Sequence, residues 1–239
     1  TRALKDKLLI QARFAATTRK SDFGFREAIK YAFSTNPTMP VYDLSSSENG
    51  GYSQQGIYDA YNPVAMIEQN TNTGNKMTSL IGLNGDYQFD GVLNGLGMKI
   101  SYQLVDEKDL QGRYYSKNSY YRGKIKNGLG SRSSGNGSNQ QLAASIYYSR
   151  KVKDLYFQIS SGYLYQEYNR SSMYLEGGDF LTDAFGFNNM AASGDFLNGL
   201  GIASSSRDSY KVISWQNSAS VVFKNRYFLN AAANYSGST

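Results

Sequence analysis

Two neighbouring stretches of the chain alternate between apolar and polar residues. Between 77 and 89 the apolar side chains stand mainly at odd positions, among them Ile81, Leu83 and Tyr87, and from 96 to 104 they stand at even positions. A β-strand points successive side chains to opposite faces, so each stretch predicts a strand with one apolar and one polar face. Segment 90–95 between them is rich in Asp, Asn and Gly and predicts the turn of an antiparallel hairpin.

The same alternation recurs along the chain. It predicts further strands at about 7–18 and 141–151, from 155 onward, at 209–223 and from 227 onward, which makes about seven with the hairpin. Three short turns each place Lys beside Asp or Asn: Lys5-Asp6-Lys7, Lys153-Asp154 and Lys224-Asn225-Arg226. Longer connections join the other strands, and short turns at one rim with long loops at the other are typical of outer-membrane β-barrels.

Aromatic residues recur on the apolar face at a spacing of eight residues. The pairs are Phe157 and Tyr165, Trp215 and Phe223, and Tyr227 and Tyr235. Eight residues on a tilted strand span about 20 Å along the barrel axis, close to the roughly 25 Å apolar band between the aromatic girdles of such barrels. The fold class predicted is therefore all-β, a transmembrane antiparallel β-barrel, with residues 1–239 forming part of one barrel domain. Seven strands are too few to close the usual barrel, which indicates a segment of a larger one.

Long extracellular loops are expected at about 19–76, 106–140 and 169–208. In the first loop we expect Ser21 or Asp22 to cap a short helix that ends at Asn36-Pro37, while Pro40 and Pro63 keep the rest irregular. The expected apolar stripe of this helix consists of Phe25, Ala28, Ile29, Ala32 and Phe33. The Gly-, Ser- and Asn-rich segment 128–139 in the second loop is expected to be flexible.

The composition excludes several classes of chemistry. The chain has no Cys and no His, which removes disulfides, thiolate and imidazole metal sites, and histidine acid–base catalysis. We predict no enzyme, no catalytic residue, no metal and no cofactor. The acidic residues Asp106, Glu107 and Asp109 are interpreted as a solvated loop, with an adventitious calcium site as the alternative. The net charge of +6 comes from scattered residues, so no nucleic-acid partner is expected.

Several short motifs resemble the SusC/RagA-like family of TonB-dependent outer-membrane transporters. Asn36-Pro37 followed by Pro40-Val41-Tyr42 resembles a loop signature of the family, and Asn62-Pro63-Val64-Ala65 resembles its second Asn-Pro-Val element. The last strand, running into Gly237-Ser238-Thr239, resembles the strand that ends in an Arg-x-Asp-Gly-Ser-Ser motif. Here Asn234 stands in place of the Arg and Ser236 in place of the Asp. The likeness covers nearly the whole chain in order and spacing.

The resemblance implies a stretch from the middle of a barrel of about 22 strands in the cell outer membrane. It implies active import of oligosaccharides or oligopeptides, a SusD-like surface lipoprotein as partner, and coupling to the TonB complex. The chain starts at Thr1, so we expect the plug domain and the TonB box to lie upstream of it. Outer-membrane lipid is an expected partner, and the basic residues Arg122, Lys124, Lys126 and Arg132 are candidates for contact with lipopolysaccharide phosphates.

Aromatic and amide residues of the long loops are the candidates for ligand or partner contact. Six residues have side chains that can stack on, or hydrogen-bond to, a sugar or peptide: Tyr120, Tyr121, Phe185, Phe187, Asn188 and Asn189. The alternative is that these side chains pack the loops themselves or a partner protein. Three other functions stay open: a passive porin, a purely structural outer-membrane barrel, and a soluble carbohydrate-binding β-sandwich.

Overall fold

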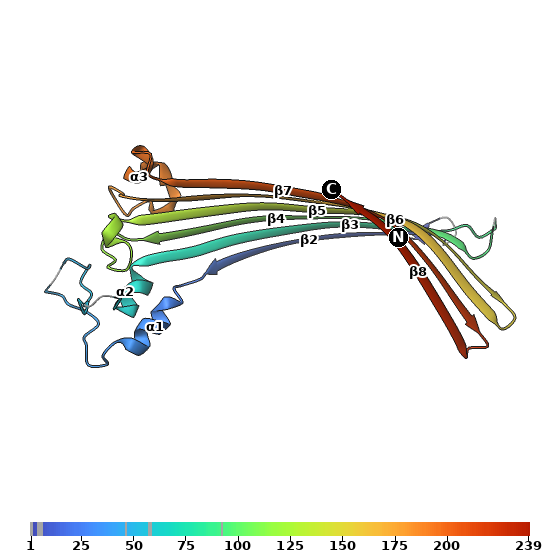
Figure 1. Cartoon of the computed structure of the whole chain (residues 1–239), viewed down its shortest axis with the longest axis horizontal. Coiled ribbons are helices and arrows are strands. Elements are labelled where there is room, and N and C mark those ends of the chain that lie inside the picture. The colour runs from blue at the N-terminus through green and yellow to red at the C-terminus, as the bar shows by residue number, and fades with distance from the viewer. Residues whose placement is uncertain (1, 4–6, 46, 57–58, 92) are drawn as a thin grey trace.

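The computed structural model describes residues 2–3, 7–45, 47–56, 59–91 and 93–239, and these form one antiparallel sheet in which every strand pairs with the next along the chain (Figure 1). The strands are β1 Arg2–Ala3, β2 Leu8–Asp22, β3 Asn70–Gln88, β4 Leu96–Tyr115, β5 Leu129–Val152, β6 Leu155–Gly178, β7 Ile202–Phe223 and β8 Tyr227–Ser238. Since β1 has two residues, the sheet consists of seven long strands. The predicted fold class, an antiparallel barrel segment, is confirmed.

The short helices of the described residues lie at one end of this sheet, on the left of Figure 1. They are α1 Glu27–Ser34, α2 Pro63–Glu68, α3 Gly194–Leu197 and the 3₁₀ turns η1 Lys124–Lys126, η2 Gly186–Asn188 and η3 Met190–Ala192. None of the helices in the described ranges is long and apolar enough to cross a membrane.

Short turns and long loops alternate between the two ends of the sheet, as the sequence predicts (Figure 1). At one end lie the turns 89–95, 153–154 and 224–226, and at the other lie the loops 23–69, 116–128 and 179–201. Lys153, Lys224 and Asn225 have positive φ, the conformation in which a tight hairpin turn follows the twist of its strands. The turn predicted at Lys5-Asp6-Lys7 falls largely outside the described residues.

Continuous pairing without a bulge keeps one set of side chains on each face of the sheet. We call the face that carries Phe14, Leu83 and Ile100 the outer face, and the face that carries Arg13 and Asn84 the inner face. In the described residues the apolar middle of the outer face is uncovered: Phe14 is 73% exposed and Leu83 is 48% exposed. The described residues form a single layer, whereas a sandwich packs two sheets face to face.

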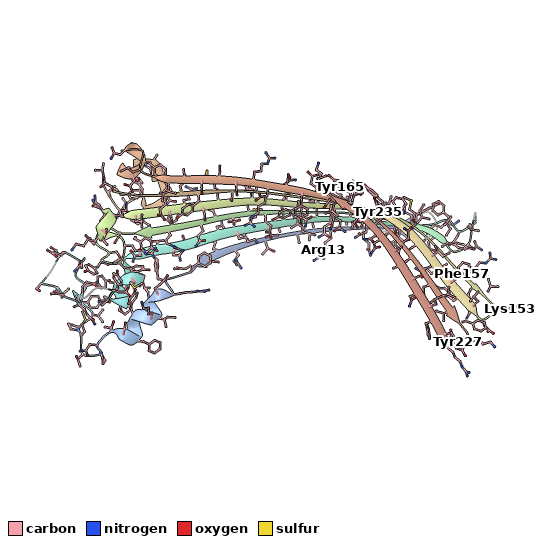
Figure 2. All side chains as sticks on the ribbon, viewed as in Figure 1. Arg13, Lys153, Phe157, Tyr165, Tyr227 and Tyr235 are labelled. Atoms are coloured by element: carbon pink, nitrogen blue, oxygen red, sulfur yellow. The ribbon has the colours of Figure 1, made fainter. Side chains whose placement is uncertain are left out.

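The aromatic residues of the outer face fall into two rows. The register places Trp215 opposite Tyr235 and Phe223 opposite Tyr227. Ring centroids lie 6.4 Å apart for Phe223 and Tyr227, and those of Tyr163 and Trp215 lie 6.3 Å apart. Figure 2 shows Phe157 and Tyr227 toward the turn end of the sheet, with Tyr165 and Tyr235 nearer its middle. The spacing of eight residues thus becomes two aromatic rows across neighbouring strands.

The strands extend further toward the loop end than the sequence predicts. Of the expected loops, 19–76 narrows to 23–69, 106–140 to 116–128 and 169–208 to 179–201. Segment 128–139, predicted as flexible, is strand from Leu129 onward. These strand ends carry polar residues on both faces, so hydrophobic alternation does not mark them, yet backbone pairing with both neighbours satisfies their amides and carbonyls.

Three predictions about the first loop are wrong in detail. Ser21 and Asp22 belong to β2, and the residue before α1 is Arg26, which makes no side-chain cap. Ile29 and Phe33 are exposed, while Tyr31 takes the buried position on this helix, because the buried side of α1 faces a cluster of tyrosines. Pro63 does not keep the chain irregular but starts α2, where a missing N–H has no cost.

Candidate functional site

Mostly aromatic side chains at the loop end form a first cluster, the tyrosine cluster. Its buried members come from α1 and the residues just before it, from α2, from the end of β4 and from the β4–β5 loop, and Tyr61 and Leu129 pack against them: Phe25, Ala28, Tyr31, Met66, Tyr115 and Tyr121. Tyr61 is central, with ring centroids 5.0 Å from Tyr31 and from Tyr121 and 5.9 Å from Tyr120. Edge-to-face pairs of this kind add to the burial of the rings. Residues far apart in sequence are therefore held as one packed unit.

Polar groups at the edge of the tyrosine cluster are paired. The Tyr31 hydroxyl donates to Asp59 Oδ1 at 2.7 Å, and Lys30 Nζ lies 2.9 Å from Asp59 Oδ2. Burial and the Asp59 hydrogen bond raise the pKa of Tyr31, and burial raises the pKa of Tyr121. Both phenols are therefore neutral at physiological pH and act as hydrogen-bonding and packing groups.

Asn62 connects two of the motifs on which the family resemblance rests. Its side-chain oxygen accepts from the backbone N–H groups of Val64 and Ala65, which caps α2. Its side-chain amide donates to the carbonyls of Val41 at 2.8 Å and Ser53 at 3.1 Å. The Asn-Pro-Val-Ala and Pro-Val-Tyr motifs thus meet in space, and their role here is to hold the first loop in one conformation.

A second cluster, the Phe180 cluster, lies over the β6–β7 loop. Tyr114, Phe180 and Met190 are buried there, with Leu175, Phe187 and Phe196 packed against them. The Tyr114 hydroxyl donates to Asp183 Oδ1 at 2.7 Å, and the same oxygen accepts from the backbone N–H of Lys117. This carboxylate therefore links the second and third loops.

The six candidate residues do not converge on one site. Tyr120 and Tyr121 belong to the tyrosine cluster, where Tyr121 is only 7% exposed. Phe187 packs on β4, where a Cβ at Gly112 would collide with its ring. Phe185, Asn188 and Asn189 are exposed in and next to η2. The candidates are divided between two clusters because the clusters lie on opposite faces of β4. Tyr114 and Tyr115, which are adjacent in this strand, point to opposite faces and so belong to different clusters.

Sequence reasoning missed Tyr31, Tyr61 and Tyr114, which organise these clusters. The paired tyrosines at 114–115 and 120–121 are the available signal, but the sequence does not show which partner each ring meets. Contact of any of the six candidates with ligand or partner stays a prediction.

Three of the four candidate basic residues have partners within the loops. Arg122 lies over the rings of Tyr115 and Tyr121, at 5.8 and 5.4 Å. Lys124 pairs with Glu48 at 3.5 Å and Lys126 with Asp195 at 4.0 Å. These cations mainly tie the loops to one another.

The inner face offers a polar wall with two kinds of surface. Across β3 and β4 it carries ion pairs, Lys76 with Glu107 at 3.1 Å and Lys99 with Asp86 at 3.7 Å. Across β6 to β8 it carries cross-strand hydroxyl pairs at 2.7 to 2.8 Å: Ser160 with Ser218, Ser172 with Ser206, and Ser214 with Ser236. Tyr168 and Tyr210 stack beside them with centroids 5.2 Å apart. A hollow of about 360 Å³ lies over β4 to β7, lined mainly by serines together with Asp109, Arg170, Met173 and Tyr174.

This arrangement suits passage and weak binding of a polar solute. Hydroxyls and a stacked aromatic pair can make multiple hydrogen bonds and ring contacts with such a solute. In the described part of the chain, acidic residues do not gather into a group that could hold a metal ion. Asp106 and Glu107, neighbours in the predicted acidic group, point to opposite faces of β4.

No model of a known protein family matches the chain, and no curated protein sequence matches it. Among solved structures, it is similar to a chain of the RagAB peptide transporter, with a TM-score of 0.74 at 12% identity over 97% of this chain. Structures of the RagAB peptide importer in its "open-open" and "closed-closed" states match with TM-scores of 0.74 and 0.75, also at 12% identity. The chain spans 26% of the length of each solved chain. The resemblance predicted from sequence is thus confirmed at the level of the fold.

Proposed function

We propose that the chain is a wall segment of an outer-membrane transporter that actively imports oligopeptides or oligosaccharides. The observation that carries this proposal is the agreement in fold, over 97–99% of the chain, with part of a peptide transporter. A band of exposed apolar residues on one face and a hydroxyl- and amide-rich wall on the other support it.

The outer face favours a lipid environment. Large apolar side chains there stay exposed on every long strand, including Phe14, Ile81, Ile146, Ile159 and Trp215. Exposing so much apolar surface to water is costly, whereas hydrocarbon solvates it without cost. The aromatic rows at its edges match the positions that aromatic residues take at membrane interfaces.

The substrate we propose is an oligopeptide in the first place, with oligosaccharide as the alternative. The similar solved structures are of a peptide transporter and importer, which favours an oligopeptide. The stacked pair of Tyr168 and Tyr210 among serine hydroxyls favours an oligosaccharide, since sugars stack on aromatic rings. Coupling to TonB and capping by a SusD-like lipoprotein complete the proposal.

Uptake by intact cells tests the function. Cells that produce the protein are expected to accumulate labelled oligopeptides, and a deletion strain is expected to lose this uptake. A protonophore is expected to abolish uptake, because active import needs the proton-motive force. Uptake that persists with the protonophore would indicate a porin, and unchanged uptake in the deletion strain for both peptides and oligosaccharides would contradict transport.

A lipoprotein lid is expected to accompany the barrel. The loop end exposes apolar side chains that the described residues leave uncovered, including Ile29, Phe33, Leu44 and Leu181. Such a surface usually marks an interface. We expect mild detergent extraction of the native protein to recover a lipoprotein in stoichiometric amount. Repeated recovery of the barrel alone, with its loops cleaved readily by protease, would contradict this.

A further inference from the structure

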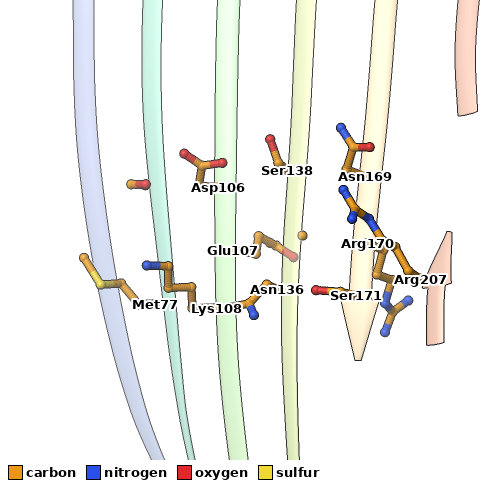
Figure 3. A pocket seen from close by; sticks show the side chains of 12 residues that line it. Met77, Asp106, Glu107, Lys108, Asn136, Ser138, Asn169, Arg170, Ser171 and Arg207 are labelled. Carbon is orange, nitrogen blue, oxygen red and sulfur yellow. The ribbon is translucent and has the colours of Figure 1, made fainter. Parts of the chain in front are cut away.

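A groove of about 400 Å³ crosses the outer face over strands β3 to β7, beyond the apolar band on the loop side (Figure 3). Its floor includes one row of residues that face each other on neighbouring strands: Lys108 opposite Asn136, Asn136 opposite Ser171, and Ser171 opposite Arg207. Figure 3 shows these four side chains side by side, with Asp106, Ser138 and Asn169 in the next row. Strands lie about 4.8 Å apart, so the two cations stand roughly 14 Å from each other at the Cα atoms.

The two cations of this row share the groove with one carboxylate of the same face, Asp106, but neither is paired with an acid in the described residues. In the described part of the chain neither Lys108 nor Arg207 forms an ion pair, although Lys76, Lys99 and Lys211 do. Glu107 does not neutralise Lys108, because it lies on the other side of β4 and pairs with Lys76. Cations at both ends with an amide and a hydroxyl between them are complementary to a saccharide that carries phosphate groups.

One end of the groove is continuous with the apolar band. Met77 faces Lys108 across β3 and β4 and lines the groove, and Ile81 follows it on the same face. Ile81 lies opposite Phe14, which is largely exposed. A ligand in the groove would therefore place its polar part against Lys108 and Arg207 and an attached hydrocarbon chain against β2 and β3.

We infer that this groove binds the phosphorylated saccharide headgroup of a glycolipid in the surrounding leaflet, with Lys108 and Arg207 on its phosphates. The inference rests on the proposed outer-membrane location and names the lipid partner of the wall. The site differs from the basic loop residues Arg122, Lys124 and Lys126, which are engaged within the loops.

Retention of lipopolysaccharide by the native protein tests the site. We expect a Lys108→Ala/Arg207→Ala double variant, purified from membranes, to retain about tenfold less lipopolysaccharide, because it loses both charge-assisted contacts. The control is Arg13→Ala/Lys99→Ala, which removes the same charge from the inner face and is expected to retain wild-type amounts. Equal retention of lipopolysaccharide by the two double variants would overturn the inference. It would also be overturned if the Lys108→Ala/Arg207→Ala variant lost phosphatidylglycerol to the same extent as lipopolysaccharide, since the groove would then bind any anionic headgroup.

Cysteine protection gives an independent measurement on a folded barrel. The chain has no Cys, so Ser171→Cys and Ser172→Cys each introduce one thiol, on the outer and the inner face. In nanodiscs, added lipopolysaccharide is expected to slow maleimide labelling at 171 and to leave 172 unchanged. Unchanged labelling at 171 would show that lipopolysaccharide does not bind in the groove. It would not contradict the proposed membrane location, which is tested separately at positions 83 and 84.

Discussion

Leu83→Arg is expected to destabilise the folded barrel in a bilayer by about 2–4 kcal/mol, whereas Asn84→Arg is expected to cost far less. Leu83 lies on the outer face between Ala12 and Tyr102, within the apolar band of β3. Asn84 is its neighbour on the inner face, between Gln11 and Ser101, where water or polar groups solvate a charge. Folding of the native protein into lipid vesicles, followed over a urea series, measures the difference between the two variants.

Single cysteines at the same two positions separate a lipid-facing wall from a buried core. A buried core would also penalise Leu83→Arg, so stability alone does not decide between them. A thiol at position 83 is expected to react slowly with polar reagents, and a fluorophore attached there is expected to report a lipid-like environment. A fluorophore at position 84 is expected to report a polar environment. Equal aqueous reactivity at both positions would contradict the assignment of the two faces and, with it, the proposed function.

Asn62→Ala is expected to destabilise the conformation of the first loop by about 2–4 kcal/mol, because α2 loses its cap and the buried carbonyl of Ser53 loses its side-chain donor. The carbonyl of Val41 keeps the backbone N–H of Ser53. Hydrogen exchange measures this effect: the backbone amides of Met66 and Gln69, which are hydrogen-bonded within α2, are expected to lose protection. Faster chymotrypsin cleavage after Tyr42 is expected to accompany it. The strands of the barrel should keep their protection, since the loop packs at one end only.

Asn36→Ala is the matched control, because Asn36 also precedes a proline. Its side chain accepts only from the backbone and hydroxyl of Thr38 on the exposed surface. Its replacement is therefore expected to change stability by no more than about 0.5 kcal/mol. Equal effects of the two substitutions would show that the network around Asn62 does not hold the loop.

The apolar band could be predicted from sequence because its signal is local. A strand that borders hydrocarbon on one side and polar groups on the other must alternate residue by residue. The two faces of the hairpin at 77–105 can therefore be assigned from its own residues, whatever strands it pairs with. The tight turns follow for the same reason, since residues that tolerate positive φ, such as Asn225, stand where the alternation breaks. The topology then follows from neighbouring strands pairing in order.

Beyond the band, polar residues occupy both faces of the strands, and the local signal ends. Ser133 and Asn136 lie in a regular strand only because β4 and β6 pair with its backbone on either side. The Lys108–Arg207 row joins residues of four strands, and the tyrosine cluster joins Tyr31, Tyr61 and Tyr121 from separate loops. Sequence determined which faces exist, because a strand with one apolar face and one polar face has a period of two. Only the tertiary structure decided which polar side chains meet, because contacts between distant segments depend on register and packing that no local pattern encodes.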